Sequence, residues 1–207
     1  MTEPEPIAAT PSPILDRHEA LGAKVVEFAG WLMPIQYSGI LEEHRAVRSA
    51  AGLFDLSHMG ELVVEGPEAG AALAKALISD PPSLAVGRAQ YSMICAADGG
   101  IIDDLIVYRL AEDRFMVVAN ASNADVVSDE LAARLDGFKA VLDDQSLATG
   151  LVAIQGPRSI DIPSRSRTWT SRASATTASP RARSRGSTRR SPGPATPART
   201  GSSCSST

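Results

Sequence analysis

The 207-residue chain is poor in the residues that typically bind metals or form disulfides. It has two cysteines, Cys95 and Cys204, and three histidines, His18, His44 and His58. The cysteines lie in two parts of the chain that differ in composition, which argues against a disulfide framework. The histidines have no metal-ligand spacing, and Cys95 has no companion. We therefore expect no metal site.

Membrane and nucleotide signals are also missing. No run approaches the roughly 18 apolar residues of a membrane span. The first 13 residues, MTEPEPIAATPSP, are acidic and proline-rich without the apolar core of a signal peptide or anchor. No Gly-x-Gly-x-x-Gly motif follows a strand and there is no Walker loop, so nucleotide-phosphate binding is unsupported. We expect a cytoplasmic protein without membrane contacts, and a disordered lead-in over residues 1–13.

Acidic residues are absent from residues 163–207, which contain nine arginines and no lysine. Removing these nine from the 20 basic residues leaves 11 basic and 24 acidic residues in residues 1–162. The net charge of that part is therefore about −13. An acidic body argues against a nucleic-acid surface there. The sequence predicts a low-complexity, disordered Arg/Ser/Pro tail over 163–207, after one folded domain over 14–162.

Apolar spacing and turn residues divide that domain into short helices and strands. Helices are expected over 14–22, 38–52, 67–78 and 122–135, with Ser38 and Ser122 as N-caps and His44 on a packed face. Strands are expected over 24–28, 53–66 (in two pieces), 88–95, 101–110, 115–121, 138–144 and 151–156. Residues 29–37 are expected to be irregular, because Pro34 opposes a helix. The pattern predicts an α+β fold, an antiparallel sheet with packed helices.

Two adjacent carboxylates, Asp103 and Asp104, lie in the apolar strand of GGIIDDLIVYRL. Successive side chains on a strand point to opposite faces, so the two acids cannot do the same job. One is expected to face solvent or the turn, and the other to face inward. Burying an unpaired carboxylate is costly. Such an acid is therefore either solvent-exposed at the end of the hairpin or part of a functional site.

Other polar and aromatic residues on apolar strands accompany this pair. Tyr91 and Tyr108 on paired strands could form a ring-sized wall, with Asp104 and Asn120 supplying directed hydrogen bonds. By contrast, Ser57-His58 is a weak nucleophile-and-base pair, because neighbours on a strand point apart. The first set therefore predicts a small-molecule site.

Five blocks, in order, resemble a known family: EFAGWLMPIQY, EEHRAVRSAAGLFDLSHMGE, QYSMICAADGGIIDDLIVYR, VVANASN and AIQGP. Together they resemble the aminomethyltransferase (T-protein) of the glycine cleavage system, without a gap from Ile14 to about Ile160. The resemblance implies the N-terminal, folate-binding domain of that enzyme. It also implies transfer of a one-carbon unit from an aminomethyl group, carried on the lipoyl arm of the H-protein, to tetrahydrofolate, with release of ammonia.

The same resemblance implies roles for individual residues. The family's key acid is the second Asp of its GG-hydrophobic-hydrophobic-DD motif, which is Asp104 here. Met59, Tyr91 and Asn120 are implied to line the folate pocket with it, while Asp103 becomes the outward, structural neighbour. A fixed carboxylate suits this chemistry, because it can orient the pterin and manage protons at its nitrogens. No metal is implied.

The family pattern breaks off near Ile162. Family members continue to an R-T-G-Y-T-G-E-D-G-F-E segment with a folate-binding Glu, then to an Arg and a C-terminal barrel, and this chain shows none of them. Displaced by one base and written with GC-rich synonyms, the codons of SPGPATPARTGSSCS regroup to V-A-R-T-G-Y-T-G-E-D-G-F-E-L-F. We therefore expect a one-base frame slip near Ile162 and a tail that did not evolve as protein.

Several interpretations remain open. The chain is either an aminomethyltransferase or an inactive truncated fragment of one, with weak folate binding and exposed strands that aggregate. Related folate-fold proteins, such as the iron–sulfur assembly factor and the sarcosine and dimethylglycine oxidase domains, are the runner-up family. A nucleic-acid arm is disfavoured, because natural basic arms use lysine as well as arginine.

Overall fold

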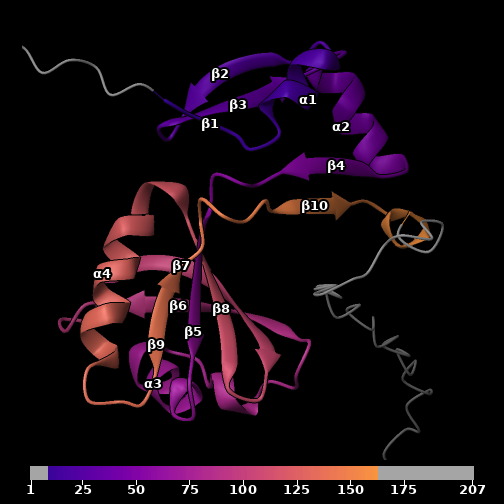
Figure 1. Ribbon diagram of the computed structural model, residues 1–207. Helices are drawn as coiled ribbons and strands as arrows, with labels where there is room; N and C mark the ends of the chain where they lie inside the picture. The colour runs from indigo at the N-terminus through magenta and orange to yellow at the C-terminus, as the bar shows by residue number, and fades with distance from the viewer. Residues whose placement is uncertain (1–8, 163–207) are drawn as a thin grey trace, which may run out of the picture. The chain divides into compact units, whose positions relative to one another are not determined.

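A computed structural model describes residues 9–162 (Figure 1). The predicted disorder of residues 1–8 and of the tail, and the suspected origin of that tail, lie outside the described residues. The described part combines helices with mainly antiparallel strands, which confirms the α+β class. None of its helices is long and apolar enough to cross a membrane.

The largest sheet has five antiparallel strands in the order β6-β7-β8-β5-β9. The strands are β5 (Gly60–Glu65), β6 (Ala89–Cys95), β7 (Ile101–Ala111), β8 (Arg114–Ala119) and β9 (Val141–Asp144). Turn residues join β6, β7 and β8 into a meander, as the sequence predicts. β5 pairs with β8 although a helix, α3 (Ala69–Ala76), and the β6–β7 hairpin separate them in the chain. The sheet therefore brings residues near position 60 beside residues near position 119.

Alternation along these strands separates a core face from a second face. The core face packs against α3 (Ala69–Ala76) and α4 (Ala124–Leu135) around a cluster of buried apolar side chains, and it also carries the buried Ser92 and Asp103. Its most buried strand residues are Leu62, Val64, Ile94, Leu105, Val107, Phe115 and Val117. Each such side chain contributes about 2 kcal/mol by leaving water. The strand period and the helix period both point into one core, so the fold of this part follows from the apolar pattern.

A smaller sheet orders the start of the described chain. It contains β1 (Thr10–Pro11), β2 (Lys24–Phe28) and β3 (Trp31–Gln36), with β1 parallel and β2 antiparallel to β3. Two predictions are therefore wrong. Residues 10–12 are not disordered, because β1 pairs with β3 and Ser12 is buried. Residues 31–36 are not irregular, because a register shift in β2 accommodates Pro34, which has no N–H for the ladder.

The helices near the N-terminus differ in detail from expectation. α1 spans Leu15–Ala20 and α2 spans Ile40–Ser49, but α2 buries none of its residues, so His44 does not pack in a core. Gly39, not Ser38, is the N-cap of α2, and the Glu43 side chain accepts the N–H of Gly39 at 2.9 Å. α4 likewise begins after Asn123 rather than Ser122.

A two-stranded antiparallel sheet joins β4 (Gly52–Asp55) to β10 (Val152–Gln155). The pairing brings together segments about a hundred residues apart, as the register of Phe54 opposite Ala153 shows. Short 3₁₀ turns complete the fold at Pro81–Ser83 (η1), Ala121–Asn123 (η2) and Ser159–Asp161 (η3).

Candidate functional site

The two adjacent acids of β7 lie on opposite faces of the large sheet. Asp103 is 4% exposed and shares its face with the buried Leu105 and Val107, whereas Asp104 is exposed. The expectation that Asp103 is the outward neighbour is therefore wrong. Asp103 lies two residues before Leu105, so its side chain points to the same face of β7 as the core residues. Hydrogen bonds compensate for its burial.

Asn120 and Asn123 supply those hydrogen bonds at the end of β8. The Asp103 carboxylate accepts the backbone N–H of Asn120 at 3.0 Å and its Nδ2–H at 2.9 Å. It also accepts Nδ2–H of Asn123 at 2.8 Å. Three amide donors therefore satisfy a buried acid and tie η2 to β7.

The same Asn120 side chain contacts the second acid. Its Nδ2 lies 2.8 Å from the backbone oxygen of Asp104 and 3.2 Å from the Asp104 Oδ1. The Asp104 carboxylate is exposed, yet it is held on one side by an amide that is itself anchored. Asp104 and Asn120, which the sequence predicts in one site, are thus direct neighbours.

Two tyrosines lie on the sheet face that carries Asp104, called the Asp104 face below: Tyr91 on the neighbouring strand β6 and Tyr108 on β7 itself. Met93 pairs with Asp104 across β6 and β7, and Tyr91, two residues earlier, pairs with Ile106. Tyr91 is 69% exposed, and Tyr108 is half-buried on the same face. Burial, with a smaller contribution from Tyr91, raises the pKa of Tyr108, so the Tyr108 hydroxyl stays protonated at neutral pH. The two tyrosines therefore share one face of the β6–β7 hairpin, and the aromatic wall that they could form stays a prediction.

Met59 approaches the same end of the sheet from β5. It directly precedes Gly60, which pairs with Ala119, and Asn120 directly follows Ala119. The four residues chosen for the folate pocket, Met59, Tyr91, Asp104 and Asn120, therefore come from four adjacent strands or strand ends. Tyr91 and Asp104 are exposed on the face opposite the core, and Met59 and Asn120 are half-buried at the ends of their strands.

Glu61 is a buried acid on the same face of β5 that no sequence argument selected. It is fully buried, pairs with Val118, and finds no partner for either carboxyl oxygen among the described residues. Burial, with the negative charges of Asp144 and Asp55, raises its pKa to about 8. The side chain is therefore neutral at pH 7, and only its alternation within GELVVE could have placed it opposite the core face.

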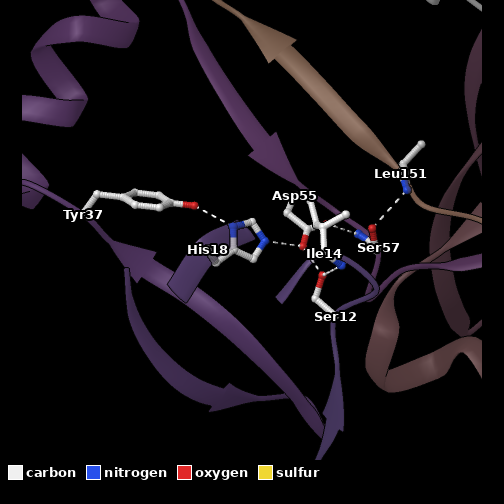
Figure 2. A network of polar contacts seen from close by, with 7 residues as sticks. All are labelled: Ser12, Ile14, His18, Tyr37, Asp55, Ser57 and Leu151. Carbon is white, nitrogen blue, oxygen red and sulfur yellow. Dashed lines mark hydrogen bonds and ion pairs between the residues drawn. The ribbon is translucent and has the colours of Figure 1, made fainter. Parts of the chain in front are cut away.

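A second polar cluster joins the small sheet to β4 (Figure 2). His18 lies between Tyr37 and Asp55, with its Nδ1 2.8 Å from the tyrosine hydroxyl and its Nε2 2.8 Å from Asp55 Oδ2. The Ser12 hydroxyl donates to the same Asp55 oxygen, and the Ser57 backbone N–H donates to Oδ1 at 2.9 Å.

This cluster has the residue types of a hydrolase triad but not the arrangement. Ser12 and His18 both contact Asp55 Oδ2, so the histidine does not lie between the serine and the acid. Ser57 accepts the backbone N–H of Leu151 at 3.1 Å and is buried. Burial disfavours the Asp55 carboxylate, but hydrogen bonds from Ser12, Ser57 and His18 outweigh this and hold its pKa below its usual value. The cluster is structural, since it binds four separate segments together.

Two other features lie apart from the Asp104 face. A hollow between α4 and β9 is lined by apolar side chains such as Leu135, Phe138 and Leu142, and it shares no residue with the four site positions. Within residues 9–162, no group of three His, Cys, Asp or Glu side chains could hold a metal ion. The Asp104 face is therefore the better candidate for a functional site.

Known proteins that resemble this chain identify its family. The chain is 55% identical over 151 residues to an aminomethyltransferase of Saccharopolyspora erythraea, which covers 73% of this chain and 41% of that protein. It is 59% identical over 142 residues to an aminomethyltransferase of Streptomyces avermitilis, with coverage of 69% and 38%. The chain thus spans about two fifths of the length of these curated relatives.

A solved structure and a family description point the same way. The fold is similar to the glycine cleavage system aminomethyltransferase T from Bartonella henselae, with a TM-score of 0.71 and 44% identity over 75% of this chain and 43% of that one. The sequence matches the family described as the GCVT N-terminal domain over residues 14–177. This match begins where the resemblance in the sequence begins, and it covers well over half of the chain. The chain therefore belongs to the GCVT N-terminal domain family.

Proposed function

We propose that the Asp104 face binds tetrahydrofolate and belongs to an aminomethyltransferase of the glycine cleavage system. The observation that carries this proposal is the exposed Asp104 carboxylate, held by Asn120 on a face with two tyrosines. The reaction would transfer the one-carbon unit from the aminomethyl-lipoyl arm of the H-protein to tetrahydrofolate and release ammonia.

The residues on this face suit a reduced pterin. Tyr91 offers an exposed aromatic ring for stacking against a flat heterocycle, and Met59 offers a polarizable side chain beside Asn120. Asp104 and Asn120 offer hydrogen-bond acceptors for ring N–H groups. The donor and acceptor set therefore fits folate, with the roles of Met59, Tyr91, Asp104 and Asn120 remaining part of the proposal.

When bound, tetrahydrofolate supplies the nucleophilic nitrogen that accepts the carbon. Asp104 has two tasks in this scheme: its carboxylate orients the ring, and it holds the proton that leaves the nitrogen. The amide of Asn120 keeps that carboxylate in one place, which lowers the entropic cost of reaching a reactive geometry.

The shared length bears on what this chain does alone. It spans about two fifths of its curated relatives, so groups from their remaining length are not among the described residues. A second candidate function follows from this share: the chain is a folded but inactive portion of the enzyme, in which the folate site is incomplete. In both cases we place the protein in the cytoplasm, with the lipoyl H-protein as its partner.

A binding and turnover measurement tests both candidates. Tetrahydrofolate is titrated into the 207-residue chain, into Asp104→Asn and into Asp98→Asn, a matched change at an exposed turn acid. Ammonia release is then followed with aminomethylated H-protein. We expect Asp104→Asn to weaken folate binding about tenfold or more, while Asp98→Asn has no effect.

The outcomes separate the candidates. Folate binding with ammonia release supports the enzyme, and folate binding without turnover supports the inactive portion. Equal folate affinity in the unaltered chain and in Asp104→Asn would contradict the assignment of the site to this face.

A further inference from the structure

We propose that Asp103 is a positioning residue for the Asp104 site, because it fixes the orientation of the Asn120 side-chain amide. The inference deepens the proposed function and rests on it for its consequence toward folate. The contact itself is a property of the free chain. The Asp103 side chain lies on the core face and not on the Asp104 face, so it acts through Asn120 and not on a ligand.

The burial of Asp103 requires a purpose beyond packing. A carboxyl group at 4% exposure is costly unless several donors satisfy it. Here the donors are the backbone and side-chain amides of Asn120 and the side-chain amide of Asn123, at 2.8 to 3.0 Å. An alanine or leucine at this position would pack against the core without any such requirement.

The three acceptors around the Asn120 amide decide which way it points. Its Nδ2 faces Oδ1 of Asp103 at 2.9 Å, the backbone oxygen of Asp104 at 2.8 Å and the Asp104 Oδ1 at 3.2 Å. A flipped amide would put Oδ1 of Asn120 against three oxygens, which is repulsive. The amide is therefore locked with Nδ2 toward the acids and its own oxygen directed away from them.

The fixed orientation of the Asn120 amide determines which hydrogen-bonding groups the Asp104 face presents to a ligand. Asn120 Oδ1 becomes a fixed hydrogen-bond acceptor beside the Asp104 carboxylate, which itself receives a hydrogen bond from Nδ2. Two fixed acceptors suit a ligand with neighbouring N–H donors, such as the ring edge of a reduced pterin. Without Asp103 the Asn120 amide loses one of the three acceptors that oppose its flip. The flipped orientation, which would turn the amide donor toward the donors of the ligand, then becomes less unfavourable.

A double-mutant cycle tests the inference, since it asks whether Asp103 acts through Asn120. The variants are Asp103→Asn, Asn120→Ala and the double change, with Asp98→Asn as the matched control at an exposed site. The readouts for the ligand-free chain are the exchange rate of the Asn120 side-chain amide and the carbon shift of the Asp104 carboxyl at fixed pH. Tetrahydrofolate affinity is the third readout.

We expect Asp103→Asn to speed exchange of the Asn120 amide about tenfold, to move the Asp104 carboxyl signal and to weaken tetrahydrofolate binding about tenfold. In the Asn120→Ala background, Asp103→Asn should change neither the Asp104 signal nor the affinity. Equal effects in the two backgrounds would overturn the inference, because a merely structural acid would act independently of Asn120.

A measurement on the unaltered chain keeps the inference testable if Asp103→Asn fails to fold. Scalar coupling across the hydrogen bond from the Asn120 side-chain nitrogen to the Asp103 carboxyl carbon reports the contact directly. Its absence would overturn the inference. If the cycle holds in the ligand-free chain but tetrahydrofolate does not bind, the proposed function fails while the positioning role stands.

Discussion

His18 and Asp55 form a buried pair that connects the start of the chain to β4. The His18 Nε2 lies 2.8 Å from Asp55 Oδ2, and their side chains are 7% and 1% exposed. Ser12 and Ser57 bind the same carboxylate, so one acid ties residues 12 and 18 to the segment around residue 55. Such a junction predicts a large cost when the acid is changed.

We expect Asp55→Asn to destabilise the fold by about 2–4 kcal/mol, because it removes a buried charged acceptor and leaves its donors without a full set of partners. Urea unfolding followed by circular dichroism measures the change. Asp16→Asn, at a 76% exposed aspartate beside Arg17, is the control and should cost less than about 0.5 kcal/mol.

The same acid predicts a pH dependence. The pKa of Asp55 lies below its ordinary value of 3.8, so its contribution to stability is complete above about pH 4. That contribution is lost as the pH falls through the lowered pKa. Acid unfolding of the unaltered chain should therefore show a loss of stability below pH 4 that Asp55→Asn lacks. If the unfolding free energies of the two chains fell in parallel below pH 4, this account would be contradicted.

Glu61 predicts the opposite slope. Its pKa is raised from 4.5 to about 8, so the folded state holds a proton that the unfolded state releases. Stability should therefore fall as the pH rises from about 4.5 to about 8, by an amount on the order of a few kcal/mol. Glu61→Gln removes the titration and should flatten the curve of unfolding free energy against pH.

The control for Glu61 is Glu65→Gln, at an exposed glutamate of the same strand. It should leave the slope between pH 5 and pH 8 as in the unaltered chain. A Glu61→Gln chain that keeps the full slope would show that another group causes it.

Gly66 is a position where a side chain cannot fit. Its φ is +139°, and an added Cβ would lie 2.4 Å from the backbone oxygen of Lys139. We expect Gly66→Ala to cost about 2–4 kcal/mol, measured by thermal or urea unfolding. Gly150→Ala is the control, because its nearest neighbour is Ser57 Oγ at 3.7 Å, and it should change stability by less than about 1 kcal/mol.

The suspected frame slip is a prediction about the gene. Sequencing the DNA across the codon of Ile162 should show that a one-base change restores a frame encoding R-T-G-Y-T-G-E-D-G-F-E. We expect this because the printed residues of the tail regroup to that motif under one fixed displacement. A neighbouring frame interrupted by stop codons, or without the motif, would refute the prediction.

Local patterns predicted most of the elements for clear physical reasons. The alternation in GGIIDDLIVYRL and the turn residues before it predicted β7 and its hairpin, and the apolar spacing predicted α3 and α4. β3 was missed because Pro34 argues against a regular ladder, and a register shift in its partner strand resolves that conflict. The caps of α2 and α4 were each misplaced by one residue, because neighbouring residues compete for the same role.

The acid pair shows the limit of sequence patterns most directly. Because they are adjacent in a strand, Asp103 and Asp104 must face opposite ways. Adjacency does not decide which of the two enters the core. Asp103 is buried because Asn120 and Asn123, seventeen and twenty residues later, reach it from the end of β8. An assignment of one acid to the inside therefore needed the positions of its hydrogen-bond donors.

By itself, the sequence determined most of the elements, the α+β class and the family, since these depend on periodicity and on contiguous motifs. Only the tertiary structure decided which acid is buried, that Glu61 is buried without a hydrogen-bond partner among residues 9–162, and that His18 meets Asp55. These depend on contacts between segments far apart in the chain, where a hydrogen bond forms or fails according to a few tenths of an ångström.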